Sequence, residues 1–373
     1  MFLTTGLRTG GAEMMLLKLC SRLDRGRFVP VVVSLGEKGV IGPRIEALGI
    51  PVYALGMRPH RPSLGGALLL RRLVKSVGPC VIQGWMYHGN LAASLAGRGK
   101  PVVWGIRQSL YDLRKERMLT RWAIRAGALI SRSAGAIVYN SETSARQHAT
   151  LGFDPSLTRI IPNGFDTDVF APDAGARAST RQELGLSEDV VVIGLIGRYH
   201  PMKNHRLFLE AAALVSRECP AARFLLAGAQ MEARDPVVGA LIAESGLGDR
   251  LLTLGERSDV PRVQAALDIA SSTSAWGEGF ANVIGEAMSC GVPCVVTDVG
   301  DSARIVGDTG RVVPSGDAHA LAAAWKDMIR LGREGRQALG MRARQRVIDQ
   351  FSLLAIVKVY EDLYGALSAR RRV

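Results

Sequence analysis

The sequence alternates short apolar runs with amphipathic helical segments, and it does so in two separate stretches. Such alternation predicts parallel strands joined by right-handed helical crossovers. In the first half, helical patterns such as residues 12–23 and 91–96 lie between the apolar runs. The strands expected there are residues 1–5, 28–34, 52–55, 81–83, 102–106 and 136–140.

The alternation stops at Pro162-Asn163-Gly164, residue types that mark a turn, and residues 173–180 (DAGARAST) read as a small, polar linker. It then restarts, with strands expected at 190–197, 224–227, 251–254, 269–272 and 293–297 and final helices at 321–331 and 356–367. We therefore predict two α/β domains, residues 1–165 and 166–351, with a last helix at about 352–373 that packs back on the first domain.

Length and composition exclude several classes of protein. The 373 residues suit two domains, and 47% apolar with 22% charged residues excludes a disordered chain. We find no uncharged apolar run of 18 residues and no secretory signal pattern, although the first strand begins so near Met1 that we expect a few N-terminal residues to be missing. The five cysteines form no C-x-x-C, which argues against disulfide and zinc sites and favours a reducing cytoplasm.

Positive charge is concentrated in the first half. Residues 1–165 hold 23 Lys and Arg against 8 Asp and Glu, whereas the remainder is nearly neutral. This asymmetry predicts that the first domain meets an anionic partner, which leaves a lipid surface, a phosphorylated substrate and nucleic acid open.

The strongest local signal is a Gly-rich turn with two glutamates, Glu278 and Glu286, in SAWGEGFANVIGEAM. A helix that begins near Phe280 would aim its free N–H groups and its positive end at this turn, which suits a diphosphate. Glu286 would accept hydrogen bonds from vicinal hydroxyls such as those of a ribose. The alternative is a solvated glutamate pair on an ordinary loop and helix.

A second signal follows the strand that ends at Gly197. Arg198 and Lys203 come directly after it, and ligands of open α/β sheets bind at such strand ends. Two cations there would neutralise phosphate oxygens. The guanidinium of Arg198 can donate two parallel hydrogen bonds, and the ammonium of Lys203 acts as a point charge. The alternative is a pair of exposed loop cations.

Together these segments resemble the retaining family-four glycosyltransferases of the GT-B fold, in which two Rossmann-like β/α/β domains face each other across a cleft. The resemblance covers nearly the whole chain. It is carried, in order, by GGAE (10–13), IPNGFD (161–166), GRYHPMKN (197–204), EGFANVIGEAMSCGVPCV (278–295) and TDVGDSARIVGDTG (297–310).

The resemblance implies a role for each matching residue. Arg198 and Lys203 would bind the donor diphosphate, Glu286 the ribose hydroxyls, and Glu278 would lie beside the transferred sugar. The backbone of the Gly-rich turn and the small first loop would approach the sugar and phosphate closely. The further donor-binding residues expected are Gly10, Gly11, Gly197, Gly279, Phe280, Ala281 and Asn282.

Two polar residues follow strands of the first domain. His88, in WMYHGN, occupies a position where family members often place a histidine against the donor sugar, so we predict that it is catalytic. The alternative is a structural or exposed histidine. Arg107, in GIRQS, would touch acceptor or phosphate, or would be a surface cation.

One loop departs from the family pattern. Many relatives carry a second glycine where this chain has Asp301, and often an acid near Arg304. Because that loop would line the nucleotide, the departure leaves the donor base and the shape of the loop open.

The implied reaction moves a sugar from a nucleotide diphosphate to a glycan or lipid-linked acceptor, with attack on the face that the diphosphate leaves. Fixed cations and helix-terminal amides would stabilise the leaving phosphate. No D-x-D pair follows a strand, so we predict that the enzyme needs neither metal nor cofactor. By analogy the pathway would be cell-surface polysaccharide synthesis, making lipopolysaccharide, capsule or exopolysaccharide.

Two basic segments of the first half, 69–75 and 113–125, have apolar residues at helical spacing and suit an anionic membrane surface. The alternative is that their apolar faces are core. We expect a cytoplasmic protein, peripheral on the inner face of the plasma membrane.

Three other functions are weighed against sugar transfer. The first is a non-catalytic GT-B partner protein. The second is a nucleic-acid-binding protein, which would need a recognition module. The third is a dinucleotide oxidoreductase, which would need G-x-G-x-x-G where this chain has G-x-x-x-G-G.

Overall fold

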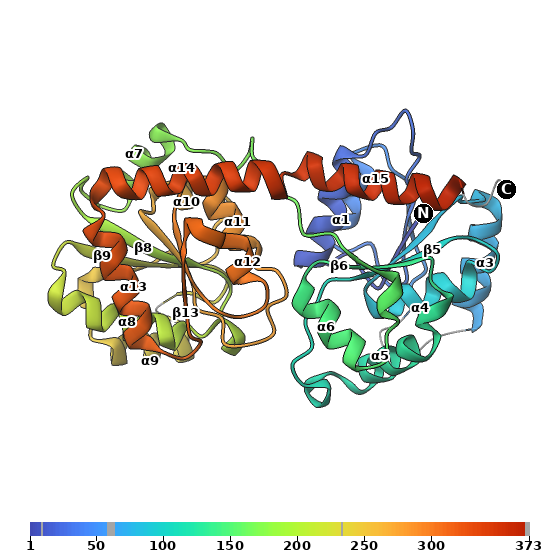
Figure 1. Cartoon of the computed structure of the whole chain (residues 1–373), viewed down its shortest axis with the longest axis horizontal. Helices are drawn as coiled ribbons and strands as arrows, with labels where there is room; N and C mark the ends of the chain where they lie inside the picture. Colours follow the sequence, from blue (N-terminus) through green and yellow to red (C-terminus); the bar gives the residue numbers. More distant parts are fainter. Residues whose placement is uncertain (9, 58–63, 233, 370–373) are drawn as a thin grey trace. The chain divides into compact units, whose positions relative to one another are not determined.

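The computed structural model describes residues 1–8, 10–57, 64–232 and 234–369, and these fall into two compact units. Unit 1 comprises Met1–Gly164 with the C-terminal segment from Leu353, and unit 2 comprises Phe165–Ser352 (Figure 1). The expected boundaries lie within one residue of these. The expected fold class, two Rossmann-like α/β domains with parallel sheets, is confirmed.

Unit 1 contains a parallel sheet in the order β3-β2-β1-β4-β5-β6-β7. Its strands are β1 (Phe2–Thr4), β2 (Val32–Ser34), β3 (Val52–Ala54), β4 (Ile82–Trp85), β5 (Val102–Ile106), β6 (Ala136–Tyr139) and β7 (Thr158–Ile160). Its helices are α1 (Gly11–Arg22), α2 (Ile41–Glu46), α3 (Leu64–Val77), α4 (Met86–Ala96), α5 (Met118–Ile130), α6 (Glu142–Thr150) and α15 (Leu353–Ala369).

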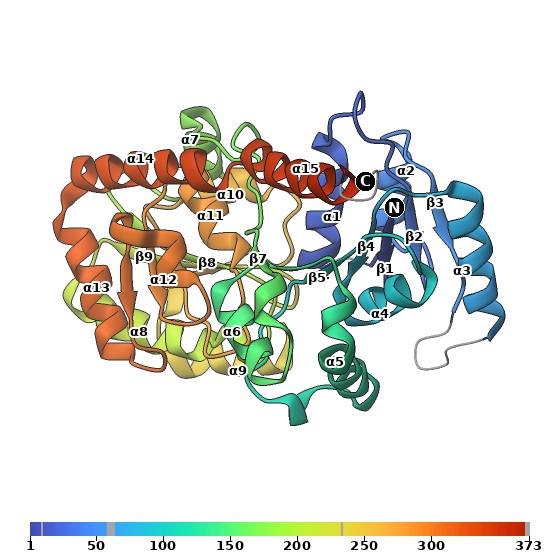
Figure 2. The ribbon, with the colours of Figure 1, turned by 45° about the vertical axis from the view of Figure 1, so that its right-hand side comes forward.

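The inner strands of the unit 1 sheet, β1, β2, β4, β5 and β6, are buried because helices cover both faces of the sheet, whereas the edge strands β3 and β7 are partly exposed. α1, α2 and α15 pack on one face, where Leu16, Ile45 and Tyr360 join one core cluster. α3, α4 and α5 pack on the other face, where Leu70, Ala93 and Ile124 join a second (Figure 2). The C-terminal helix α15 therefore completes the core of a domain that begins at the other end of the chain.

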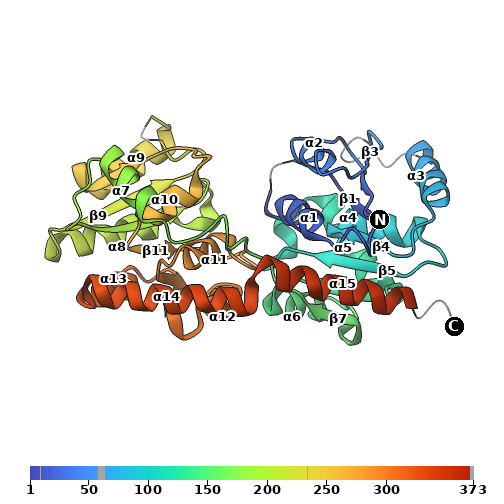
Figure 3. The ribbon, with the colours of Figure 1, turned by 90° about the horizontal axis from the view of Figure 1, so that it is seen from above.

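Unit 2 repeats the arrangement in the order β10-β9-β8-β11-β12-β13. Its strands are β8 (Val191–Ile196), β9 (Ala222–Ala227), β10 (Leu251–Thr253), β11 (Ile269–Ser272), β12 (Cys294–Thr297) and β13 (Arg311–Val313). Its helices are α7 (Ala174–Glu183), α8 (His205–Glu218), α9 (Pro236–Ser245), α10 (Val260–Ala266), α11 (Asn282–Ser289), α12 (Ser302–Val306), α13 (Ala318–Arg330) and α14 (Gly332–Phe351). Figure 3 shows α13 and α14 along one side of this unit.

The linker expected at residues 173–180 is wrong, because α7 begins there. The Asp173 side chain accepts a hydrogen bond from the backbone N–H of Ala176 at 2.8 Å, so it caps the helix, and alanine favours the helix that follows. The small, polar residues of this segment favour a loop, but an aspartate before an alanine-rich run is also a signal for the start of a helix.

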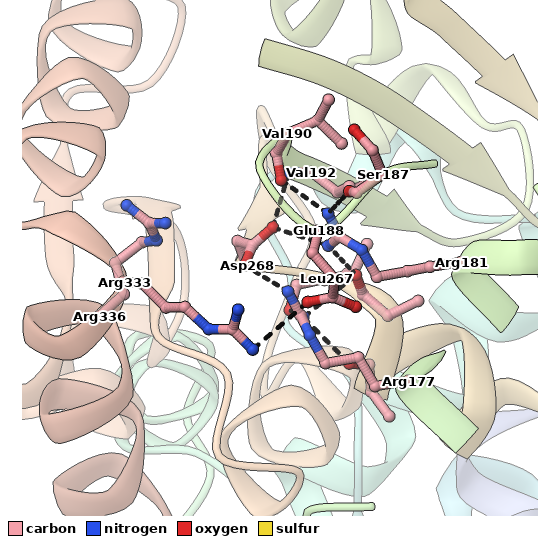
Figure 4. A network of polar contacts seen from close by, with 12 residues as sticks. Arg177, Arg181, Ser187, Glu188, Val190, Val192, Leu267, Asp268, Arg333 and Arg336 are labelled. Atoms are coloured by element: carbon pink, nitrogen blue, oxygen red, sulfur yellow. Dashed lines mark hydrogen bonds and ion pairs between the residues drawn. The ribbon is translucent and has the colours of Figure 1, made fainter. Parts of the chain in front are cut away.

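Arginines on α7 are bound to a single aspartate. Arg177 and Arg181 donate to the carboxylate of Asp268 at 2.8 and 3.0 Å, and the backbone N–H of Val192 donates to it at 2.8 Å. Figure 4 shows Arg336 reaching toward the same group from α14. Since Arg181 is only 1% exposed, Asp268 is the counter-charge that permits its burial.

The basic segment at 113–125 is not one helix. Residues Leu113–Lys115 form a 3₁₀ turn, and α5 begins only at Met118. The Asp112 carboxylate caps the short turn by accepting from the backbone N–H of Arg114 at 2.9 Å, so the chain is redirected before α5 starts. Among the described residues no helix is long and apolar enough to span a bilayer.

Candidate active site

The candidate site of unit 2 lies where the strand order of its sheet reverses. Neighbouring strands β8 and β11 send their connections to opposite sides, and the gap at their C-terminal ends is where open α/β sheets bind ligands. β8 leads into residues 197–204 and β11 leads into residues 273–281, the two segments that carry Arg198, Lys203 and Glu278.

The loop after β8 is held by its own polar side chains. His200 accepts a hydrogen bond from the backbone N–H of Met202, and Asn204 caps α8 by accepting from that of Leu207. Asn204 adopts a left-handed conformation with φ 50°, which asparagine tolerates better than most residues. This tight turn fixes the position of Lys203 at the start of α8.

Lys203 forms an ion pair with Glu278, so the structure brings together two of the predicted catalytic residues. The Ser274 hydroxyl also donates to the Glu278 carboxylate at 3.1 Å. Two further bonds join the same loops, from the backbone N–H of Ala275 to the Met202 carbonyl and from the Thr273 hydroxyl to the Lys203 carbonyl, both 2.8 Å. These bonds hold the two loops together and so fix the Lys203–Glu278 pair.

The helix after the Gly-rich turn begins at Asn282, two residues later than expected. Its cap residue is Ala281, whose side chain cannot accept a hydrogen bond from the first turn of α11. Phe280 is buried, with its ring 6.0 Å from that of Phe165 and 5.7 Å from that of Phe351. Phe280 thus anchors the turn, and its side chain is not part of an open site.

Glu286 lies on α11, four residues after Asn282. Residues four apart in a helix share a face, so Glu286 lies on the same face of α11 as Asn282. Its side chain is partly exposed, as a group that binds a ribose would have to be.

A third loop, which the sequence did not connect with the Glu278 turn, lies directly against it. The backbone N–H of Asp301 donates to the Gly279 carbonyl at 3.0 Å, and a Cβ added at Gly300 would lie 2.0 Å from the Glu278 carbonyl oxygen. Asp301 is buried and pairs with Arg304 at 3.4 Å. The two residues that depart from the family pattern thus pair with each other beside the site.

Positive charges act on the two histidines that follow β8. Burial, and then the positive charges of Arg198 and Lys203, hold the pKa of His200 below its usual value. Burial, with Lys203 adding to it, lowers the pKa of His205 to about 4. Both imidazoles are thus neutral near pH 7, and Arg198, which is exposed, lies close enough to Lys203 for both to act on His200. These charges favour an anion, and Lys203 is already paired with one, the Glu278 carboxylate.

Unit 1 also places its predicted residues where its strand order reverses, between β1 and β4. Gly10 is the extended cap residue of α1, Gly11 is its first residue, and His88 is the third residue of α4. A Cβ at Gly10 would lie 2.4 Å from the Glu13 carboxylate, so the space beside this glycine is taken by Glu13.

His88 follows an unusual backbone conformation. Met86, the first residue after β4, has φ 67°, a strained value for a residue with a long side chain. The Trp85 indole N–H donates to the Ala12 carbonyl at 2.8 Å, which ties the end of β4 to α1. A Cβ added at Gly89 would lie 2.3 Å from the Leu3 carbonyl oxygen, so α4 lies unusually close to β1 and carries half-buried His88 beside it.

Arg107 is not a surface cation, so that alternative is wrong. It is 8% exposed and donates to the Tyr360 hydroxyl at 2.7 Å and to the Asn163 side chain. Its guanidinium also lies over the ring of Trp85, 4.8 Å from the centroid. Arg107 thus connects β5 with α15 and with the turn before Gly164. A role toward acceptor or phosphate stays a prediction.

No group of three or more His, Cys, Asp or Glu side chains in the described part of the chain is arranged to hold a metal ion. The described cysteines are unpaired thiols.

Two family models match the chain, one on each domain. Residues 9–169 match a model described as Glycosyltransferase Family 4, and residues 190–330 match one described as Glycosyl transferases group 1. The lipopolysaccharide core biosynthesis mannosyltransferase LpsB of Rhizobium meliloti is 27% identical over 90% of this chain and 92% of its own length.

Other relatives match over a shorter region. The UDP-Gal:alpha-D-GlcNAc-diphosphoundecaprenol alpha-1,3-galactosyltransferase of Escherichia coli is 28% identical over 57% of this chain, and a D-inositol 3-phosphate glycosyltransferase of Mycobacterium is 35% identical over 49%. The chain spans only about half the length of these two relatives, 54% and 42%.

Solved structures share the fold of the whole chain. Anabaena Alr3699/HepE, solved in complex with UDP, is 25% identical with a TM-score of 0.84 and covers 98% of this chain and 99% of its own. A glycosyltransferase from Rickettsia africae, 18% identical, has a TM-score of 0.85 and covers 98% of this chain and 97% of its own. The GT-B fold class that the sequence implied is confirmed.

Proposed function

The chain belongs to the glycosyltransferases of the GT-B, family 4 type, and on that premise we propose that it transfers a sugar from a nucleotide diphosphate sugar to a glycan or lipid-linked acceptor with retention of configuration. The observation that carries this proposal is the Lys203–Glu278 pair, fixed before the first turn of α11 where the sheet order of unit 2 reverses.

The arrangement suits the charge changes of the proposed reaction. The bond between the anomeric carbon and the phosphate oxygen breaks, the acceptor oxygen bonds to the same face of that carbon, and the acceptor proton passes to the leaving phosphate or to solvent. Negative charge grows on the leaving phosphate. Arg198, Lys203 and the backbone N–H groups at the start of α11 would stabilise it.

Glu278 and Glu286 have separate proposed roles. Glu278 is held by Lys203 and Ser274, so its carboxylate is positioned to accept a hydrogen bond from a hydroxyl of the transferred sugar. Glu286, further along α11, would bind the ribose hydroxyls of the nucleotide. The backbone of Gly197 and Gly279 would allow the diphosphate to approach closely.

In unit 1 we propose that His88, with the backbone of Gly10 and Gly11, contacts the donor sugar and the reacting centre. Because Arg198 and Lys203 would supply positive charge to the diphosphate, we expect turnover without an added metal ion or cofactor. The relatives named for lipopolysaccharide core biosynthesis and for a diphosphoundecaprenol substrate support a place in cell-surface polysaccharide synthesis. We propose that the protein works in the cytoplasm.

The test is a thermal-shift screen with UDP-, GDP- and ADP-sugars, followed by measurement of donor hydrolysis and transfer, with and without a chelator. We expect one donor class to raise the melting temperature; a ligand at 100 times its Kd adds about 2.7 kcal/mol. Lys203→Ala and Glu286→Ala should abolish the shift. Lys326→Ala, which removes the ion pair of half-buried Lys326 with exposed Glu218 in the same unit, is the matched control and should keep the shift.

If no nucleotide sugar stabilises the wild-type protein, the donor assignment is wrong. If one binds but is neither hydrolysed nor transferred, the chain is a non-catalytic binding protein. Inversion at the anomeric carbon, read by NMR of the product, would overturn retention.

A further inference from the structure

The helical layer formed by α3, α4 and α5 contains no carboxylate. α4 packs against both other helices, and none of the three sequences includes an Asp or a Glu. The nearest acids, Asp112 and Glu116, precede α5 and are bound to Arg114 and Gln108. This face of unit 1 is thus where the excess positive charge of the first half is least compensated.

The outer side of α5 carries an apolar stripe that is exposed. Met118, Trp122 and Leu129 are 62%, 61% and 86% exposed, and their spacing places them on one side of the helix. Ala123 and Ile124 on the opposite side are buried. The core of unit 1 is therefore complete without the stripe.

The neighbouring helices also carry exposed apolar side chains. Leu64 and Leu68 on α3 are 87% and 56% exposed, and Leu95 on α4 is 73% exposed. All three helices of one layer thus expose large apolar side chains, which are typical of interaction sites where they gather.

A groove at the C-terminal ends of α3 and α4 gathers positively charged side chains. It encloses about 480 Å³, and its apolar lining includes Leu68, Val74 and Ala96. The lining contains no acid, and its cations, which make no ion pair among the described residues, are Arg71, Arg72, Lys75, Arg98 and Lys100.

We propose that the outer face of α3, α4 and α5 binds the surface of an anionic phospholipid bilayer. The exposed Trp, Met and Leu side chains enter the boundary between headgroups and acyl chains, and the groove cations meet lipid phosphates. Arg and Lys stems lie along the apolar surface while their charges stay with the headgroups. A nucleic acid would match the cations but leave the apolar stripe without a partner.

This inference deepens the proposed function, because α4, the central helix of the layer, carries His88 in its first turn. A lipid-linked acceptor would thus be held beside the domain edge where transfer is proposed. Membrane binding is nevertheless measured without donor or acceptor, so the two proposals can fail separately.

The experiment is flotation of the full chain with phosphatidylglycerol or phosphatidylcholine vesicles at low and high salt. We expect at least about tenfold stronger binding to the anionic vesicles, weakened by salt, and a blue shift of tryptophan emission. Trp122→Ser combined with Met118→Ser should remove the blue shift, and Arg71→Glu combined with Arg72→Glu should lower binding at least about tenfold.

The control for the charge reversal is Arg206→Glu combined with Arg330→Glu, two exposed arginines of unit 2 with the same change in net charge. The control for the stripe is Val237→Ser, an exposed apolar residue on α9. Equal loss of binding in a control, equal binding to both vesicle types, or salt-sensitive binding to RNA or DNA without vesicle binding would overturn the proposal. Donor hydrolysis, measured in parallel, should be unchanged in all four variants.

Discussion

The Lys203 ammonium is bound to the Glu278 carboxylate, although 75 positions separate the two residues. Both side chains are more than four-fifths buried, at 19% and 13% exposure, and each belongs to a loop that follows a strand at the reversal point of the sheet. The sequence places both residues after strands, but only the fold shows that a cation and an acid of the predicted site neutralise each other before a donor arrives.

Lys203→Ala should lower kcat/KM for the donor by about 10²–10³, because the leaving phosphate loses a fixed cation, a loss of about 2.7–4 kcal/mol in the transition state. It also leaves Glu278 without its cation. Steady-state kinetics with the donor found in the screen would measure this. Glu278→Gln, which keeps the hydrogen bond from Ser274, should impair kcat more than donor affinity. Wild-type rates in Lys203→Ala would contradict the proposed leaving-group role.

Gly300→Ala should disrupt the donor site through the loop that presses on it. Gly300 has φ 64°, and the added Cβ would lie 2.0 Å from the Glu278 carbonyl oxygen. Gly316→Ala is the matched control, since φ is 81° there and nothing lies within 4 Å of the added Cβ. Both variants carry the cost of a left-handed alanine, about 1–2 kcal/mol, but only Gly300→Ala should abolish the donor-induced thermal shift. Equal effects would show that the Gly300 contact does not shape the site.

The sequence predicts the repeating architecture well because periodicity reports burial, and the inner strands of both sheets are buried on both faces. The prediction is less successful where the apolar signal is interrupted. The expected strands do not include β7 and β13, each of which contains an arginine within three residues, and α7 is assigned to a linker because its small and polar residues resemble loop composition. Helix starts such as Asn282 differ from expectation because propensity does not fix the first residue of a helix.

The composition of the site is predicted from motifs, but its internal bonds are not. Nothing in the order of residues indicates that Asp301 and Arg304 pair beside the Glu278 turn, because that contact depends on β12 lying next to β11. The burial of Arg107 is likewise invisible, since its partner Tyr360 lies 253 positions away on α15.

Arg107→Met should destabilise unit 1 while leaving donor binding by unit 2 nearly unchanged. The substitution removes two buried hydrogen bonds, to Tyr360 and to Asn163, and a hydrogen bond to a charged group contributes about 1.5–3 kcal/mol. Urea unfolding followed by circular dichroism measures the loss. Arg146→Ala on α6, an exposed arginine that bonds only Thr143 in the described structure, is the control and should change stability by less than about 0.5 kcal/mol. A stable Arg107→Met protein with no transfer activity would instead support a direct role toward the acceptor.

His148 should make the stability of unit 1 depend on pH. The imidazole is buried, its Nδ1 donates to the Ser144 carbonyl at 2.7 Å, and its Nε2 accepts from the Tyr87 hydroxyl at 2.9 Å, so the neutral ring is fully bonded. Burial, which outweighs the bond to Ser144, lowers the pKa of His148 to about 4, against about 6.5 in the unfolded chain.

As pH falls from 6.5 toward 4, the unfolded chain therefore binds a proton that the folded chain does not, and His148 takes about 1.4 kcal/mol per pH unit from the free energy of unfolding. Below about 4 both states are protonated and this loss stops growing. Urea unfolding from pH 7.5 to 4 would measure the slope. His148→Gln, which does not titrate, should reduce it by about 1.4 kcal/mol per pH unit and leave the contribution of His205, whose pKa is also lowered to about 4. Tyr87→Phe keeps the buried imidazole and should keep the slope while lowering stability at every pH. An unchanged slope in His148→Gln would show that other groups cause the dependence.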